Sequence, residues 1–167
     1  MKFVKMFDEE KTRKKIYTPK QALLKAASYC AYQERAQQEV RDKLYEWGLH
    51  QEDVEEIISQ LISDNFLNEE RFAIAYTLGK LRIKSWGKIK IKQSLKLKRV
   101  SDPLIKIAFS KIDLDEYEDK LHDLLDKKQL SLKDKDVYIL KNKLFQYALS
   151  RGFESDLISS LLKEKGL

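Results

Sequence analysis

Ten basic residues, with no acid among them, lie in residues 71–101 and are the part of this sequence best suited to binding chemistry. They are Arg71, Lys80, Arg82, Lys84, Lys88, Lys90, Lys92, Lys96, Lys98 and Arg99. The chain has 167 residues and a net charge of +6, so this basic stretch, at +10, leaves −4 for the remainder. Neighbouring like charges repel, and a phosphate backbone relieves that repulsion through neutralisation and counterion release. The pattern indicates a polyanionic or acidic partner.

We expect nine of these bases to contact DNA or an acidic filament: Lys80, Arg82, Lys84, Lys88, Lys90, Lys92, Lys96, Lys98 and Arg99. No residue pattern here is suited to reading base edges, so such binding would be non-specific and sensitive to salt. The alternative is a solvated helix face, because lysine stems often cover apolar surface while their charged ends stay in water.

Residue sets typical of catalysis or metal binding are missing from the sequence. Its two Gly-Lys pairs are followed by Leu81 and Ile89, where a phosphate-binding loop needs Ser or Thr. Cys30 is the only cysteine and there are two histidines, too few for a disulfide or a His/Cys zinc site. We therefore predict a protein that is not an enzyme and holds no metal or other cofactor.

Composition predicts a helical protein without a membrane span. The chain is 43% hydrophobic and 36% charged, and five Gly and two Pro are too few for a turn-rich β-sandwich or barrel. No apolar run approaches the ~18 residues of a membrane span, and the amino terminus lacks the apolar region of a signal peptide. We expect a cytoplasmic, all-α monomer.

Helix starts are recognisable at four places. Thr18 and Ser101 are capping residues that stand close to a proline. Asn68 is a cap followed by two acids, and Asp113 forms a capping box with a glutamate three residues later. These signals and the apolar spacing predict helices over residues 19–33, 37–47, 52–64, 69–84, 88–99, 103–111, 114–128, 135–150 and 155–165.

Further signals refine these helices. Gly48 and Gly152 are typical of helix ends, and Leu67 is placed to staple onto Phe72. Residues 88–98 alternate between basic and apolar with period two, as a half-buried strand would. We predict a helix there, because no turn residues separate the two alternating runs and the repeat described next places them on a helix.

An apolar pattern recurs three times along the chain. Its positions, offset by 51 and then 53 residues, are Val40, Leu44, Leu49, Val54, Ile57 and Ile58; Ile91, Leu95, Val100, Ile105, Ala108 and Phe109; and Leu144, Ala148, Phe153, Ile158, Leu161 and Leu162. Their helical spacing on both sides of a short turn fits two packed helices. The sequence predicts an elongated, curved array of three-helix repeats over residues 19–66, 67–112 and 113–167, preceded by a basic arm, residues 1–18.

The most specific motif begins in residues 66–76, Phe-Leu-Asn-Glu-Glu-Arg-Phe-Ala-Ile-Ala-Tyr, and continues ten residues later with Trp-Gly and then Ile91. This pattern resembles the bacterial RecX family over roughly residues 19–167. The residues that carry it are Arg71, Phe72, Ala73, Tyr76, Trp86 and Gly87. We expect them to be structural, with Phe72 and Tyr76 filling one core face of a helix. The third repeat matches only in its apolar pattern and at residues 151–153.

The resemblance implies a function as well as a fold. Members of that family regulate homologous recombination and DNA repair, including the SOS response, by binding in the groove of the RecA–DNA filament and limiting its ATPase and strand exchange. They also bind single- and double-stranded DNA without sequence preference. Two alternatives stay open: a stand-alone non-specific DNA-binding module, and a helical-repeat adaptor for other proteins.

Two residues depart from the family pattern, and two stretches of the chain are rich in acids. Ala36 stands where the family often has a serine cap and Arg99 where it has a glycine turn, so we expect both helix ends to be weakened. Residues 51–70 contain seven acids and no base, and residues 113–126 are also rich in acids. These stretches are either ordinary helix surface or face basic elements of a protein partner.

Overall fold

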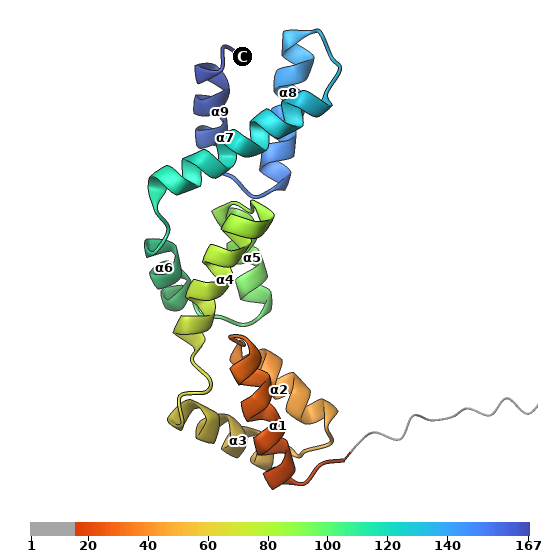
Figure 1. The fold of residues 1–167 in the computed structure, drawn as a ribbon, viewed down its shortest axis with the longest axis vertical. Helices are drawn as coiled ribbons and strands as arrows, with labels where there is room; N and C mark the ends of the chain where they lie inside the picture. The colour runs from red at the N-terminus through yellow and green to blue at the C-terminus, as the bar shows by residue number, and fades with distance from the viewer. Residues whose placement is uncertain (1–15) are drawn as a thin grey trace, which may run out of the picture.

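The structure, a computed structural model, describes residues 16–167, and in that range it contains nine helices and no strand. They form three units along an elongated molecule, α1–α3, α4–α6 and α7–α9 (Figure 1). The helices are α1 Pro19–Tyr32, α2 Gln37–Glu46, α3 Gln51–Ser63, α4 Glu69–Lys84, α5 Lys88–Leu97, α6 Asp102–Ser110, α7 Leu114–Ser131, α8 Val137–Ser150 and α9 Ser155–Glu164. The all-α fold and its three tandem units are confirmed. Most of the predicted basic arm, residues 1–15, lies outside the described residues.

None of the helices within residues 16–167 combines the length and the apolar composition that crossing a membrane requires.

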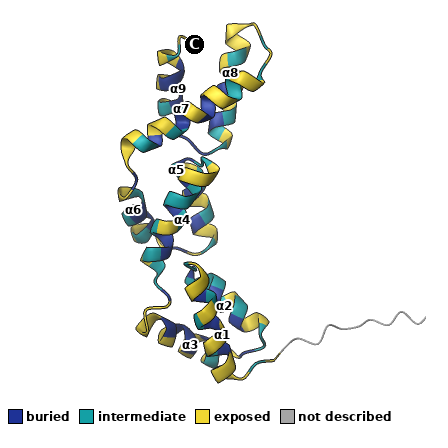
Figure 2. Cartoon of the chain, in the orientation of Figure 1, coloured by how far each residue is buried: buried dark blue, intermediate teal, exposed yellow. Residues whose placement is uncertain are grey.

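The recurring apolar positions form the core of each unit. All of them are buried except Phe109, which is half-buried, and the buried residues face inward in every unit (Figure 2). The stretch that alternates with period two is helix α5, as predicted. Ile91 and Leu95 are fully buried on one face of it, whereas Leu97 is 85% exposed on another. The alternating apolar residues therefore do not share one face, as they would in a strand.

Two predicted helix starts are confirmed in atomic detail. The Thr18 hydroxyl accepts the backbone N–H of Gln21 at 3.3 Å, and the Gln21 side chain accepts the N–H of Thr18 at 3.1 Å. The Asn68 side chain accepts the N–H of Arg71 at 2.8 Å. Each cap satisfies N–H groups that the first turn of a helix leaves without an intrahelical partner.

Two other starts differ from the prediction. Ser101 makes no side-chain cap. Helix α6 begins at Asp102, one residue before Pro103, and the Asp102 carboxylate pairs with Lys96. The Asp113 side chain does cap α7, but the Glu116 carboxylate binds a guanidinium of the preceding unit instead of completing a capping box.

The turn between the second and third helices of each unit uses a left-handed residue. Gly48 has φ +87° and Gly152 has φ +92°, as expected of glycines that end helices. The corresponding residue of the second unit is Arg99, with φ +59°. A side chain in this region costs about 1–2 kcal/mol relative to glycine, so the expected weakness at this helix end has a structural basis.

The buried side chains form two separate clusters. One belongs to the first unit, and the other runs continuously through the second and third units and includes Ala36 of the first. Leu67 lies in the first cluster and Phe72 in the second, so the expected staple between them is wrong: the chain crosses from one core to the other between these residues. The second and third units therefore share one apolar core, while the first unit has its own.

Backbone contacts join the second unit to the third. The N–H of Gly87 donates to the carbonyl of Arg151 at 2.8 Å, and the N–H of Ile89 donates to the carbonyl of Gly152 at 3.0 Å. Between them, the N–H of Lys88 donates to the Tyr117 hydroxyl at 2.9 Å. A side chain on Gly87 would overlap the backbone of Gly152, which explains why the Trp-Gly motif needs glycine at this point.

We predict that Gly87→Ala lowers the free energy of unfolding by about 1–3 kcal/mol, because the added methyl group forces the two backbone segments apart. Urea denaturation followed by circular dichroism measures the change. The matched control is Gly79→Ala, which adds a methyl group to open space within α4 and should raise stability by up to ~1 kcal/mol. Equal stability of Gly87→Ala and the wild type would show that this contact does not hold the units together.

Candidate nucleic-acid interface

The structure divides the ten bases of the basic stretch into three groups. Four form ion pairs, Arg71, Arg82, Lys96 and Lys98. Three others place their ammonium groups over aromatic rings, Lys80, Lys88 and Lys90. The remaining three, Lys84, Lys92 and Arg99, are exposed, and their side chains have no hydrogen bond, ion pair or ring contact with any residue in 16–167.

Three of the ion pairs reach into neighbouring units, and one of them joins Arg71 to Glu34 of the first unit. Arg82 of α4 binds Glu116 of α7 through two hydrogen bonds, at 2.6 and 3.1 Å, and the guanidinium lowers the pKa of the Glu116 carboxyl. Lys98 binds Glu39 of α2. The acidic stretch around Glu116 thus supplies a partner inside the chain, a role that the sequence spacing of 34 residues did not reveal.

Aromatic side chains fix the second group of bases. The Lys80 and Lys90 ammonium groups lie 4.9 and 4.7 Å from the centre of the Trp86 ring, and Lys88 lies 4.7 Å from that of Tyr117. An aromatic ring attracts a cation through its quadrupole and carries no charge of its own. These lysines are therefore held in place while keeping their positive charge for a partner.

The unpaired bases carry the charge that is most accessible to a partner. Lys92 lies four residues after Lys88 and four before Lys96, so these three lysines share one face of α5. Arg99 is exposed in the turn that follows this helix. Lys84 lies in the last turn of α4. Because no acid within the described residues neutralises these three, they are the strongest candidates for contacts with phosphate.

The family-motif residues lie in the core or at its edges. Phe72 and Ala73 are buried, and the Tyr76 hydroxyl hydrogen-bonds the Ser94 hydroxyl across the seam between α4 and α5. Arg71 binds Glu34 of the first unit and the side chain of Asn65. Trp86 is half-buried between the two lysines that contact its ring.

The junction between the first and second units is polar, which sequence reasoning missed. The Glu69 carboxylate accepts the N–H of Gln37, at the start of α2, at 3.1 Å, while the Glu39 carboxylate accepts the N–H of Ala36 at 2.9 Å. Two acids thus replace the cap that Ala36 cannot provide. One oxygen of Glu34 and one of Glu69 are buried without a hydrogen-bond partner in the described part of the chain.

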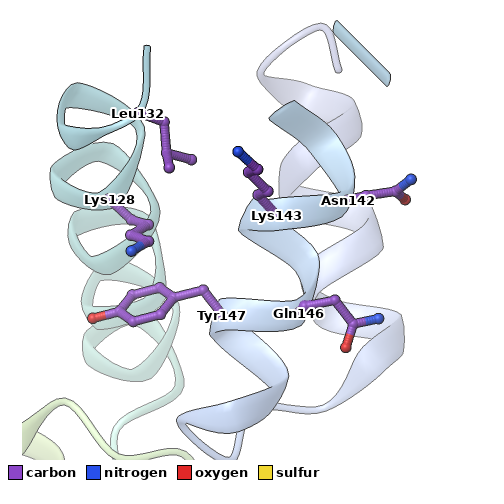
Figure 3. Close-up of a pocket in the computed structure, with 6 residues that line it drawn as sticks. All are labelled: Lys128, Leu132, Asn142, Lys143, Gln146 and Tyr147. Carbon is purple, nitrogen blue, oxygen red and sulfur yellow. The ribbon is translucent and has the colours of Figure 1, made fainter. Parts of the chain in front are cut away.

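A hollow of about 560 Å³ lies between α7 and α8 in the third unit. Figure 3 shows Lys128 of α7 and Leu132, just after its end, facing Lys143 and Tyr147 of α8. Both lysines are already engaged, because Lys128 lies 4.7 Å from the centre of the Tyr147 ring and Lys143 binds Asp134 at 2.7 Å. In residues 16–167, no three His, Cys, Asp or Glu side chains are grouped as a metal site would require.

Three domain models of one protein family match the chain in order. The model described as "RecX, first three-helix domain" matches residues 22–61, the second domain matches residues 68–108 and the third matches residues 115–162. Each match falls on one of the three-helix units of the structure.

Curated proteins and solved structures are also similar to most of this chain. "Regulatory protein RecX" of Clostridium perfringens (strain 13 / Type A) is 35% identical over 77% of this chain and 61% of its own length, and that of Bacillus cytotoxicus is 29% identical over 86% and 53%. The chain thus spans between about half and three fifths of the length of these relatives. The crystal structure of RecX from Lactobacillus salivarius superposes with a TM-score of 0.79 at 26% identity, covering 87% of this chain and 95% of that one.

We predict that the stability of the junction between the first two units decreases as pH rises through the pKa of Glu69. Burial raises this pKa above its ordinary value, against the opposing effects of the Gln37 N–H and Arg41. The folded state then holds the Glu69 proton more tightly than the unfolded chain does, so its stabilising effect is complete at low pH and lost above the raised pKa.

The measurement is Tm against pH, between about pH 4 and pH 8, for the wild type and Glu69→Gln. The Gln amide oxygen still accepts the Gln37 N–H and does not titrate, so Tm of the wild type minus Tm of the variant should fall as pH rises. Glu70→Gln, at an exposed acid of the same turn, is the control. A difference that is constant with pH, or that grows, would contradict the prediction.

Proposed function

The chain belongs to the RecX family of regulatory proteins, and on that premise we propose that it regulates homologous recombination by binding the filament that a RecA-type recombinase forms on DNA. Binding inhibits the ATPase and strand-exchange activities of the filament. The observation that carries this proposal is the match of three successive RecX domain models to three successive units of the structure.

The basic stretch supplies the contact with DNA in this proposal. Lys84, Lys92 and Arg99 are exposed and unpaired within the described residues, so a phosphate backbone gains three cations without breaking an existing ion pair. Counterion release makes such binding favourable at low salt and weak at high salt. None of these side chains is placed in a pocket that would select a base, so sequence preference is not expected.

The elongated shape supports inhibition by occupancy. A rod of three units along a filament groove contacts several recombinase subunits at once, and it restrains the movements between subunits that ATP turnover requires (Figure 1). The same rod obstructs access of a second DNA molecule. This mechanism needs only differential binding to one state of the filament, and it assigns no chemical step to the chain.

A second candidate function is a stand-alone DNA-binding module that acts without a recombinase. The unpaired bases favour it equally, because contact with phosphate does not depend on a protein partner. The two functions differ in stoichiometry: a module that only coats DNA must occupy much of the strand, whereas a filament regulator acts at a few sites along the filament.

The deciding experiment measures the single-strand-DNA-dependent ATPase of the cognate RecA, titrated with this protein at fixed salt and with DNA in excess. We expect inhibition at less than one molecule per recombinase subunit, because each rod restrains several neighbours. Inhibition that disappears when more DNA is added would instead indicate competition for free strands, and hence the stand-alone module.

We further predict that the triple substitution Lys84→Gln, Lys92→Gln and Arg99→Gln weakens DNA binding and reduces the slope of log affinity against log salt by roughly 2, or about 0.7 for each lost phosphate contact on a single strand. The matched control removes the same charge from exposed sites of the third unit, through Lys127→Gln, Lys133→Gln and Lys163→Gln. Equal salt slopes for the two triple variants would contradict the assignment of the basic face.

A further inference from the structure

A hollow of about 270 Å³ lies beside α4, where the end of the first unit meets the second. Gln33, just after α1, forms one side of it. One face of α4 forms the other, with Ala75, Gly79, Lys80, Ile83 and Lys84. No carboxylate is among its described lining residues, although 27 of the 167 residues of the chain are acidic. The hollow is therefore a site of positive charge.

The two lysines of the hollow are arranged to bind an anion. The Lys80 ammonium lies 5.2 Å from the centre of the Tyr76 ring and 4.9 Å from that of the Trp86 ring, so two uncharged partners fix its position. The ammonium of Lys84, one turn later on the same face, has no partner among the residues that the structure describes. One cation is thus pre-positioned and a second is free to follow a ligand.

Gly79 lies in the interior of α4, where glycine is one of the least favourable residues. No left-handed turn requires it, and beyond its chain neighbours and the backbone of its own helix, no heavy atom of the described residues lies within 4 Å of the position that a Cβ would take. Neither backbone conformation nor internal packing explains this glycine. Its effect is to leave the surface of α4 bare inside the hollow, beside Lys80 and Ile83.

Ile83 adds an apolar surface at the same place. It lies in the hollow next to Lys84, and its side chain is 80% exposed. A single Ile on a surface needs no explanation, but an apolar group beside two cations matches a sugar–phosphate chain, which presents apolar sugar carbons between its charged phosphates.

We infer that this hollow, between Gln33 and the Gly79 face of α4, is a seat for the phosphodiester backbone of a DNA strand, bound by Lys80 and Lys84. The inference rests on the proposed function and makes it specific, because it assigns DNA contact to a shaped site on α4 in addition to the lysine-bearing face of α5. A partner helix packed against Ala75 and Gly79 is the competing occupant. The charge of the lining residues favours phosphate.

The test fills the hollow without disturbing the fold. Gly79→Ala and Gly79→Leu introduce good helix formers, so Tm of Gly79→Ala should rise by about 2–4 °C. We expect the affinity for a fluorescein-labelled oligothymidylate, measured by anisotropy, to fall about threefold for Ala and about tenfold for Leu as the hollow is filled. A loss of affinity in a stabilised variant cannot come from unfolding. Ser159→Leu, at an exposed position of α9, is the control for added apolar surface.

A duplex of the same length tests whether the seat accepts single or double strands, and a graded loss for either probe supports the inference. Wild-type affinity in both Gly79 variants would overturn it. If the triple variant Lys84→Gln, Lys92→Gln and Arg99→Gln still bound DNA more weakly than the wild type, the proposed function would stand. Unchanged DNA binding with lost inhibition of the recombinase ATPase would assign the hollow to a protein partner and also overturn the inference. If the wild type bound neither probe, the proposed DNA contact would fail together with this one.

Discussion

The array depends on how the free N–H groups at the start of the second helix of each unit are satisfied. Those groups have no intrahelical partner, and neither Ala36 nor Gly87 offers a capping side chain. In both cases the following unit provides acceptors: a Glu69 oxygen for α2, and the Arg151 and Gly152 carbonyls with the Tyr117 hydroxyl for α5. The last unit has no successor in the described chain, and there the Asp136 side chain caps α8 by itself. The order of the units therefore follows from these contacts, because the free N–H groups of α2 and α5 find acceptors only when the next unit is in place.

The two junctions that result differ in physical character. The second and third units share a continuous apolar core and meet through backbone hydrogen bonds at a pair of glycines, an arrangement that tolerates little displacement. The first and second units have largely separate cores, joined through Ala36, and they meet mainly through carboxylates, an arginine and a lysine. Two carboxylate oxygens at this junction are buried without a hydrogen-bond partner in residues 16–167. Ion pairs weaken with salt and with protonation, whereas apolar burial does not. The stability of the first junction should therefore depend on ionic conditions more than that of the second, and the hollow beside α4 lies at this first junction.

Local signals in the sequence account for most of the fold, and tertiary contacts account for what was missed. Spacing and caps located every helix to within a few residues, because helix periodicity and Asn68-type caps act over three or four residues. The staple between Leu67 and Phe72 failed because the chain passes between two cores at that point, which local spacing does not record. The site was predicted as one basic stretch, and composition could not tell which bases have partners. Arg82 and Lys98 find theirs 34 and 59 residues away, and Lys80 is held by rings from two parts of the motif.

Arg99 links the charge of the second unit to its backbone. The turns of the three units are equivalent in position and in their left-handed conformation, yet only the second has a side chain there. Glycine in its place would relieve about 1–2 kcal/mol of backbone strain. Arg99 is exposed and has no partner in residues 16–167, so no contact within the described structure compensates for that strain. Gly79 also lowers stability without a compensating contact in the described structure, because glycine is one of the least favourable residues in a helix interior. In both positions the residue present is worse for the fold than an obvious substitute, and in both it increases the positive charge or the open surface that a phosphate backbone would contact. Both positions thus lower local stability on elements of the second unit where DNA binding is proposed, which is expected of a binding surface more than of a merely solvated one.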